Sequence, residues 1–474
     1  MNLRQIENKI LSRLALIKGD KMLLLVVILL FLFSINAVLS SVSKIVATPT
    51  SRISVLFTQL VVIAFSGFLI FAIYKYGSFK RLMKWSLVGY IFSIFLLVFL
   101  CFHCRIDGIM ESQRINDSWR TILFFGKIQI HVFEVVKIFS VMYMALILNR
   151  FQEDEQVYLE NQSDEEILAD KRGFWILRHW AYHFQQAWID APGTKRALFI
   201  YLPFVATCGM VSMSSNSSLI IIAFGMLVAL YIGGFSRKKL ILFILTCIIG
   251  GAGMIAIKSS SSEGNSTNRV ETLLSRLDAF FTPYDEGVEE IIGEMQGKNP
   301  TKTQTDLDNY IDKNRQVQGA RFAIREGGIS PLGKLPGGST QKYVVMNMFG
   351  DFMFSFICEE YGIIGAIFVL LLFGFLIARG TKIAGYCKED FARTTVASLV
   401  ILISGQALLH VLVNVGIVPM TGQTLPLLSD GKSAFVMFSI GLGVVLCVSR
   451  LVREEIEMQE RETETEEVET KGLE

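Results

Sequence analysis

The sequence predicts an all-α polytopic membrane protein with about ten transmembrane helices and both termini in the cytoplasm. Of its 474 residues, 52% are hydrophobic, and the mean hydropathy is +0.47, which is too apolar for an ordinary soluble domain. The apolar residues occur in blocks of about twenty, the length that crosses a hydrocarbon core of about 30 Å. Every second loop between the blocks is basic, as cytoplasmic loops of membrane proteins are. We therefore expect a multi-pass protein of the cytoplasmic (inner) membrane, in contact with membrane lipids.

Ten apolar blocks define the predicted spans. They lie at about 22–41, 53–74, 85–102, 130–149, 197–214, 218–235, 239–257, 350–378, 395–418 and 432–449. Residues 1–21 form a charged cytoplasmic segment, and the first block is longer than the apolar region of a cleavable signal peptide, about 7–15 residues. We therefore predict a retained first helix and a transmembrane domain over residues 22–450. The acidic cytoplasmic tail, 451–474, is expected to be a solvated helix or disordered.

Basic residues between the spans set the predicted orientation. They follow the second, fourth, sixth, eighth and tenth spans, which places each of these loops in the cytoplasm. The crossings then return the C-terminus to the side on which the chain begins. The basic residues are Lys75, Lys80, Arg81, Lys84, Arg150, Lys171, Arg172, Lys195, Arg196, Arg237, Lys238, Lys239, Arg379, Lys382, Lys388, Arg393, Arg450 and Arg453.

Two long polar stretches separate the spans. The cytoplasmic loop 150–196 has an acidic first half and an aromatic, basic second half containing Trp175, Trp180 and Trp188, which we expect to lie in the membrane interface. The large extracytoplasmic loop, 258–349, lies between the seventh and eighth helices and is rich in Gly, Ser, Asn and charged residues. Loops of this length in a compact protein are usually functional or disordered.

Charge and cysteine content narrow the class of function. The formal net charge is +2 and there is no basic domain, so nucleic acid is not an expected partner. The seven cysteines are scattered, and their odd number argues against a disulfide framework. Cys101 and Cys104 flank His103, but a structural zinc site needs about four ligands and no second pair stands nearby. We interpret the two thiols as a chance pair.

The strongest local signal is a glycine-rich segment where the large extracytoplasmic loop re-enters the membrane. In order, it contains Gly337-Gly338-Ser339-Thr340-Gln341-Lys342, Gly350-Asp351-Phe352 and Glu359-Glu360. Glycines let the backbone approach a ligand closely, and the N–H groups there can face phosphate oxygens. Asp351 is expected at the mouth of the eighth helix in apolar surroundings, where a carboxylate is a candidate general base. The competing interpretation of Asp351 is a helix N-cap.

Glu134 and Lys137 are spaced three residues apart in the fourth span. Residues at this spacing share one face of a helix, and charged groups within a membrane pair with one another. One interpretation is a structural ion pair. The other is a pair that lines a central cavity near a substrate.

Two C-terminal segments resemble the signature of the SEDS family (FtsW, RodA and SpoVE). They read GGISPLGKLPGGSTQK…GDFMFSFICEEYGIIGA and GQALLHVLVNVGIVPMTGQTLPLLSDGKSAF. Upstream, RLDAFFTPYDE, which begins with Arg276, is similar to the family's Arg-…-AFLDP-…-D segment. Glu134 and Lys137 match its SE-xx-K element, and Trp119 and Arg120 loosely match its NGAxRW element. The resemblance covers essentially the whole chain and is most specific in the C-terminal half.

The resemblance implies a peptidoglycan glycosyltransferase of the division branch, which polymerises lipid II at the outer face of the membrane for septal wall synthesis. The implied partners are lipid II, a class B penicillin-binding protein acting as transpeptidase, and other membrane proteins of the divisome. The family's essential aspartate falls on Asp351, the implied general base. The implied substrate-binding residues are Trp119, Arg120, Glu134, Lys137, Arg276, Ser339, Gln341, Lys342 and Glu360.

The implied chemistry agrees with the residue types. A β1,4 bond formed from an α-linked glycosyl diphosphate requires inversion by in-line attack of a sugar hydroxyl, so one carboxylate must accept the hydroxyl proton. The diphosphate can leave once its charge is neutralised, either by basic side chains or by a divalent cation, Mg²⁺ or Mn²⁺. The basic candidates, unless they only keep the loop soluble, are Arg276, Arg315, Arg321, Arg325, Lys334 and Lys342.

The chain departs from the family pattern at several positions. Met348-Phe349-Gly350 precedes Asp351, where the family has an aromatic residue or His followed by Thr or Ser, and an extra stretch near 286–312 lengthens the large loop. Two alternative functions stay open. One is a transporter (flippase) of the lipid-linked precursor, with Glu134 and Lys137 in its pathway, although no internal repeat supports a transporter plan. The other is a non-catalytic scaffold that recruits a transpeptidase.

Overall fold

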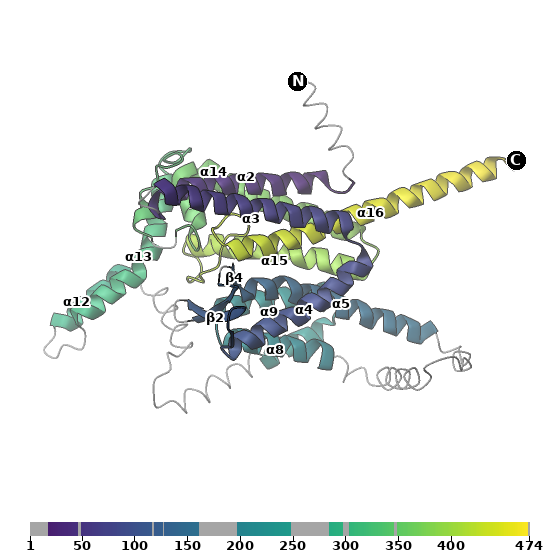
Figure 1. The fold of residues 1–474 in the computed structure, drawn as a ribbon, viewed down its shortest axis with the longest axis horizontal. Coiled ribbons are helices and arrows are strands. Elements are labelled where there is room, and N and C mark those ends of the chain that lie inside the picture. The colour runs from purple at the N-terminus through teal and green to yellow at the C-terminus, as the bar shows by residue number, and fades with distance from the viewer. Residues whose placement is uncertain are drawn as a thin grey trace, which may run out of the picture.

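The computed structural model describes residues 18–45, 49–115, 118–126, 128–160, 197–247, 284–296, 303–345 and 348–472. Apolar helices form a bundle with a small β-sheet near one end (Figure 1). The long helices are α2 (Lys21–Ile45), α3 (Pro49–Tyr76), α4 (Phe79–Cys101), α5 (Val132–Glu160), α14 (Met353–Tyr386), α15 (Asp390–Asn414) and α16 (Lys432–Gly472). Shorter elements follow α5, namely the π-helix η3 (Ala197–Tyr201), α8 (Leu202–Ser212), α9 (Asn216–Ile232) and a helical segment at 237–247.

Among the residues that the structure describes, six helices are long and apolar enough to cross a membrane, by length and composition. They are Phe57–Tyr76, Phe79–Cys101, Val132–Gln152, Met353–Tyr386, Asp390–Asn414 and Lys432–Thr463. Shorter apolar helices occur at Lys21–Ala37, Leu198–Ser212 and Asn216–Ile232. Each of these coincides with a predicted span, and the seventh predicted span, 239–257, is helical where it is described, to residue 247. The chain is therefore a multi-pass membrane protein.

The structure differs from the all-α expectation between α4 and α5. Four antiparallel strands form a sheet there, in the order β1 (Arg105–Ile106), β2 (Met110–Ile115), β3 (Ser118–Phe124) and β4 (Ile128–His131). The Ser433 hydroxyl at the start of α16 donates to the Gln129 carbonyl at 3.1 Å and accepts from the His131 N–H at 3.2 Å. The sheet is thus fixed to the bundle through α5, which follows β4 directly, and through α16.

Helix α5 is the most enclosed of the six candidate spans, with 89% of its most apolar stretch buried. It packs against α4, α9, α15 and α16. The rings of Tyr143 on α5 and Tyr90 on α4 stack with centroids 4.0 Å apart. A Cβ placed on Gly225 of α9 would lie 2.9 Å from side-chain atoms of Val141 on α5 and Leu402 on α15, so three helices meet closely at this glycine. The central helix therefore carries Glu134 and Lys137 into the interior.

The first and last helices are connected at the end of the bundle opposite the sheet. Asp20, just before α2, accepts a hydrogen bond of 2.9 Å from the Arg379 guanidinium of α14, and its N–H donates to Ser449 Oγ of α16 at 2.6 Å. Helix α16 extends past the bundle at this end, while α12 (Tyr284–Gln296) and α13 (Gln304–Gly327) project at the other (Figure 1). The acidic tail is helical to Gly472, one of its two expected states.

Both long polar stretches are partly helical. Helix α5 continues to Glu160, and residues 161–196, with the tryptophans expected in the membrane interface, lie outside the described residues. In the second stretch, 258–349, α12 and α13 were not predicted from the sequence, and residues 258–283 lie outside the described part of the chain. Helix α13 leads directly into the glycine-rich segment, so this segment is anchored by regular structure at both ends.

Two glycines bring the end of the large loop against α14. Gly362 interrupts the helix with φ 64° and ψ −161°, and Gly333 has φ 66°. A Cβ on Gly362 would lie 2.4 Å from both the Gly333 nitrogen and the Pro331 oxygen, a distance at which the backbones would have to separate. Only glycine fits this contact, because it combines positive φ with the absence of a Cβ.

Replacing Gly362 with alanine is therefore expected to destabilise the protein by about 2 kcal/mol or more, because it adds backbone strain and a steric clash. Thermal unfolding of the purified protein in detergent measures this loss as a lower Tm. Gly374 lies on the same helix, and a Cβ placed on it would meet no other atom within 4 Å, so Gly374→Ala is the matched control and should leave Tm unchanged or raise it. Equal Tm values for the two variants would contradict the prediction.

Candidate active site

Asp351 lies in the turn that precedes α14, at the end of the bundle that carries the sheet. Its side chain is half-buried. A Cβ placed on Gly422, in the segment between α15 and α16, would lie 3.6 Å from Asp351 Oδ2. The carboxylate therefore faces this segment (residues 415–431, the α15–α16 segment).

The N-cap interpretation of Asp351 is not supported. The N-cap residue of α14 is Phe352, one position further on, and it makes no side-chain cap. The N–H of Phe354 donates to His410 Nε2 at 3.3 Å and the N–H of Ser355 donates to Asn414 Oδ1 at 3.0 Å. Helix α15 thus supplies acceptors for the first turn of α14. The general-base assignment of Asp351 stays a prediction.

The backbone around Asp351 is held in place from α15 and the α15–α16 segment. Asn414 Nδ2 donates to the Asp351 carbonyl at 3.2 Å, and Ser429 Oγ donates to the Gly350 carbonyl at 2.8 Å. The Asp430 N–H donates to the Phe349 carbonyl at 2.9 Å. Three successive carbonyls therefore accept hydrogen bonds from outside the turn. These bonds fix the backbone from which the Asp351 side chain projects.

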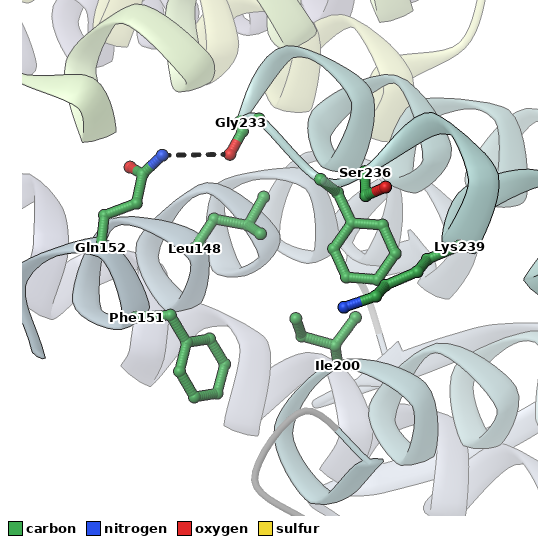
Figure 2. A pocket seen from close by; sticks show the side chains of 9 residues that line it. Leu148, Phe151, Gln152, Ile200, Gly233, Ser236 and Lys239 are labelled. Carbon is green, nitrogen blue, oxygen red and sulfur yellow. Dashed lines mark hydrogen bonds between the residues drawn. The ribbon is translucent and has the colours of Figure 1, made fainter. Parts of the chain in front are cut away.

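A hollow of about 220 Å³ lies elsewhere in the protein (Figure 2). Its lining comes from the C-terminal part of α5, from η3 and from the turn after α9. The sheet and Asp351 lie at the N-terminal end of α5, so this hollow is not part of the candidate active site.

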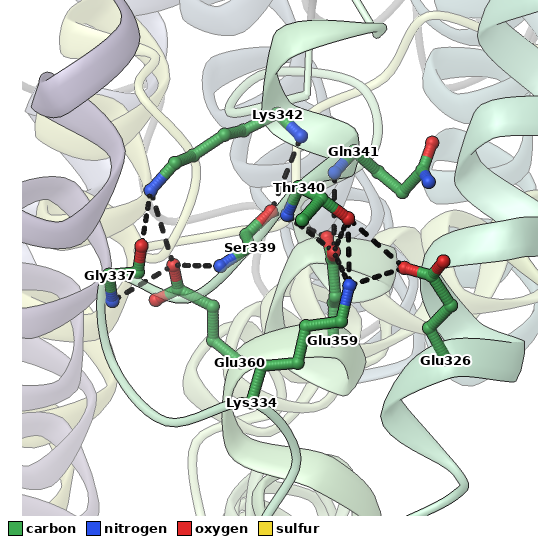
Figure 3. Close-up of polar contacts among 9 residues, drawn as sticks. All are labelled: Glu326, Lys334, Gly337, Ser339, Thr340, Gln341, Lys342, Glu359 and Glu360. Carbon is green, nitrogen blue, oxygen red and sulfur yellow. Dashed lines mark hydrogen bonds and ion pairs between the residues drawn. The ribbon is translucent and has the colours of Figure 1, made fainter.

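Glu359 is a fully buried carboxylate in the second turn of α14, and the glycine-rich segment wraps around it (Figure 3). Its Oε1 accepts from Lys334 Nζ at 2.9 Å, from the Thr340 N–H at 2.7 Å and hydroxyl at 3.1 Å, and from the Gln341 N–H at 3.2 Å. Its Oε2 accepts from Ser339 Oγ at 2.5 Å. Five hydrogen bonds therefore stabilise this buried charge.

Glu360 is also fully buried and binds the first part of the same segment. Its carboxylate accepts from the Gly337 N–H at 3.1 Å and the Ser339 N–H at 3.3 Å, and it lies 3.7 Å from Lys342 Nζ. The Ser40 hydroxyl of α2 donates to Glu360 and accepts from the Gly337 N–H at 2.7 Å. The first helix thus contacts the segment that leads to Asp351.

These contacts correct the phosphate-binding interpretation of the glycine-rich segment. The N–H groups of Gly337, Ser339, Thr340 and Gln341 point to the carboxylates of Glu359 and Glu360, so these four are not directed at an external phosphate (Figure 3). Ser339, Lys342 and Glu360 are at most 2% exposed. Their assignment to substrate binding stays a prediction, and in the structure these three side chains take part in the contacts that hold the chain before Asp351. Gln341 is half-buried, and its N–H belongs to the same set of contacts.

Lys334 extends the cluster to α13. Its amine also contacts Glu326 and donates to Thr340 Oγ1 at 2.7 Å. The hydrogen bond from Lys334 holds the pKa of Glu326 below its usual value. Burial opposes the charge on Lys334, but hydrogen bonds from its amine to Glu326 and Glu359 outweigh burial and raise its pKa. The stabilisation from Glu326 is present above its unfolded-state pKa and is lost as the pH falls through the lowered folded-state pKa.

The predicted ion pair between Glu134 and Lys137 is confirmed. Lys137 is fully buried, and its amine donates to Glu134 Oε1 at 2.7 Å, Gln406 Oε1 at 2.9 Å and Gln423 Oε1 at 3.0 Å. All three ammonium protons therefore have acceptors. Gln423 follows Gly422, so the Lys137 cluster and Asp351 are linked by adjacent residues of the α15–α16 segment. Both interpretations of the pair, structural and cavity-lining, are compatible with this link.

Of the remaining predicted site residues, Trp119 and Arg120 lie on the β-sheet and Arg276 lies outside the described residues. Trp119 on β3 stacks on His103 with ring centroids 4.2 Å apart. Arg120 follows Trp119 on the same strand, and its Nε is buried.

The basic candidates divide into two groups. Lys334 and Lys342 are bound within the buried cluster, whereas Arg315, Arg321 and Arg325 are exposed on α13. A Cβ on Gly416 of the α15–α16 segment would lie 2.8 Å from Arg321 Nε, so this guanidinium adjoins the segment that approaches Asp351. Within the described parts of the chain, no group of three His, Cys, Asp or Glu side chains could hold a metal ion.

The comparison with known families decides the identity of the fold. Residues 20–454 match the model of the FtsW/RodA/SpoVE family, described as cell cycle proteins. The chain belongs to this family. The resemblance inferred from the C-terminal motifs is therefore confirmed over nearly the full length.

Individual relatives agree with the family match. The chain is 35% identical over 135 residues to a probable peptidoglycan glycosyltransferase FtsW of Caulobacter vibrioides, covering 28% of this chain and 34% of that protein. It is 26% identical over 275 residues to the probable peptidoglycan glycosyltransferase FtsW of Bacillus subtilis, covering 57% and 61%. The matched segments thus span from about a third to three-fifths of these relatives' lengths.

Solved structures show the same fold at low sequence identity. A chain of a peptidoglycan synthase complex, described for its coordination of polymerization and crosslinking, superposes with a TM-score of 0.57 at 19% identity, covering 92% of this chain and 98% of that one. A crystal structure of a variant of the Rod shape determining protein RodA of Thermus thermophilus gives a TM-score of 0.51 at 17% identity, covering 91% and 97%.

Proposed function

We propose that this protein is a peptidoglycan glycosyltransferase that polymerises lipid II into β1,4-linked glycan strands with inversion, using Asp351 as general base. The observation that carries the proposal is the placement of Asp351, whose carboxylate faces Gly422 at the end of the bundle while α15 supplies acceptors for the first turn of α14. Relatives named as peptidoglycan glycosyltransferases support the reaction class.

The proposed chemistry assigns one task to each group. The acceptor hydroxyl gives its proton to Asp351 as its oxygen attacks the donor anomeric carbon, and the diphosphate leaves from the opposite face. Arg321, which lies beside the α15–α16 segment, is assigned to neutralise the charge of the diphosphate. The described residues form no metal cage, so we derive no step through Mg²⁺ or Mn²⁺.

The topology and partners belong to the same proposal. We place ten crossings in the cytoplasmic (inner) membrane, with both termini in the cytoplasm and the sheet, α12 and α13 outside. Contacts among Asp20, Arg379 and Ser449 support a common side for the start and the end of the transmembrane domain. A class B penicillin-binding protein is the proposed partner in division, supported by the likeness to a chain of a complex that coordinates polymerization and crosslinking.

Polymerisation of purified lipid II by the full-length protein tests this function. The expected result is glycan strands, visible by gel electrophoresis, in the presence of the partner transpeptidase. Parallel reactions without the partner and with a chelator determine whether either is required. Liposomes with lipid II confined to one leaflet separate the transport alternative, because flipping without polymer would contradict the proposal.

A further inference from the structure

We infer that the hollow between α5 and α9 binds the phosphate head group of an anionic membrane lipid. This α5–α9 hollow is bounded by the C-terminal part of α5, by η3 and by the turn that joins α9 to the helix at 237–247 (Figure 2). The lining residues are Leu148, Phe151, Gln152, Ile200, Gly233, Gly234, Phe235, Ser236 and Lys239. Its position at the end remote from Asp351 makes it independent of the proposed catalytic function.

A pair of glycines shapes this hollow. A Cβ on Gly233 would lie 2.4 Å from Leu148 Cδ1, so a side chain there would force Leu148 to move out of the contact between this turn and α5. Gly234 has φ 79°, and a Cβ on it would lie 3.3 Å from Gln152 Nε2. The Gln152 amide donates to the Gly233 carbonyl at 3.3 Å, which joins the two walls at one side (Figure 2). The two glycines and this hydrogen bond therefore define the shape of the hollow where α5 meets the turn after α9.

Lys239 gives the hollow its charge. Its amine projects over the apolar lining near Ile200 (Figure 2). No acidic side chain lines the hollow, and among the described residues no carboxylate pairs with this amine. A cation beside an apolar surface attracts an anion whose own body is apolar. The first N–H groups of the helix at 237–247 lie beside it and add to the attraction for an anion.

The size and surroundings point to a lipid phosphate. A volume of about 220 Å³ accommodates a phosphate group and its glycerol attachment but not acyl chains. Exposed apolar side chains lie on the two helices next to the lining residues, Leu202 and Val205 on α8, which follows η3, and Leu242 and Leu245 at 237–247. Leu242 lies three residues after Lys239 and shares its helix face. A lipid could thus place its phosphate at Lys239 and its chains along these side chains.

The test uses the full-length protein in detergent, titrated with dioleoylphosphatidylglycerol and, separately, with dioleoylphosphatidylcholine, and native mass spectrometry counts the lipids retained. The variants are Lys239→Gln and Lys239→Glu. Lys238→Glu is the matched control, because Lys238 is the adjacent exposed lysine and does not line the hollow. Both lysine side chains are exposed, so we expect each variant to fold.

The wild-type protein is expected to retain phosphatidylglycerol in preference to phosphatidylcholine. Lys239→Gln should weaken retention about fivefold, Lys239→Glu should weaken it further, and Lys238→Glu should change it little. A millimolar excess of inorganic phosphate should not displace the lipid, because phosphate lacks the apolar body. Equal retention by wild type and Lys239→Glu, or displacement by free phosphate alone, would overturn the inference.

Discussion

Replacing Asp351 with asparagine is expected to reduce lipid II polymerisation by about 10²- to 10⁴-fold, the contribution typical of a general base. Asparagine keeps the size and polarity of the side chain but cannot accept the proton of the attacking hydroxyl. The main-chain contacts that hold this turn, from Asn414 and Ser429, do not involve the carboxylate and should persist. The measurement is the rate of strand formation from purified lipid II, with thermal unfolding in detergent as the check that the variant is folded.

Two further variants make the Asp351 result specific. Asp430→Asn removes a neighbouring exposed carboxylate, whose residue contacts the same turn through its backbone N–H, and should retain activity. Asp351→Glu keeps a base in a displaced position and should retain partial activity. Wild-type rates from Asp351→Asn would rule out the base assignment and would favour the transport or scaffold alternatives.

Replacing Glu359 with glutamine is expected to destabilise the protein by about 3–5 kcal/mol, as when one member of a buried ion pair is removed. The neutral amide would no longer balance the positive charge of Lys334. Its N–H₂ group would also face the Ser339 and Thr340 donors that now bind the carboxylate. The glycine-rich segment would then lose its attachment to α14. We expect a lower Tm and, because this segment leads to Asp351, a lower polymerisation rate.

Glu326→Gln is the matched control for Glu359→Gln. Glu326 contacts the same lysine, but its side chain is 34% exposed, so water replaces part of what the mutation removes. Exposed ion pairs contribute at most about 1 kcal/mol. A Tm loss for Glu326→Gln equal to that of Glu359→Gln would show that burial of Glu359 is not the source of its effect.

The helices could be predicted from the sequence because a membrane-spanning helix forms all its backbone hydrogen bonds within itself and must be apolar over a fixed length. The sheet could not, because strands such as β2, with the sequence MESQRI, lack the apolar alternation that marks a half-buried strand. Helix α13 is polar over most of its sequence, and the residues that it buries most completely, Ala320 and Ala323, are small, so its packed face was not evident from the sequence. Both elements form through contacts with other parts of the chain.

The candidate site was only partly predictable, because some of its contacts also join distant parts of the chain. Family motifs and the cost of a charge near the membrane identified Asp351, and spacing identified the Glu134–Lys137 pair. Spacing could not show which groups the glycine-rich N–H groups face, because their acceptors lie in the following helix. The adjacent acidic pair Glu359 and Glu360 within an apolar helix was the available signal, since two buried carboxylates need nearby donors.

The contacts of α2 have a consequence for biosynthesis. Asp20 and Ser40 stand at opposite ends of this helix, yet they bind residues that the ribosome adds 359 and 320 positions later, Arg379 and Glu360. During insertion, Asp20 and Ser40 lack these partners until the last third of the chain is made. A nascent chain released before α14 therefore lacks the contacts that close the bundle, and it would be a substrate for membrane proteases rather than a smaller working protein.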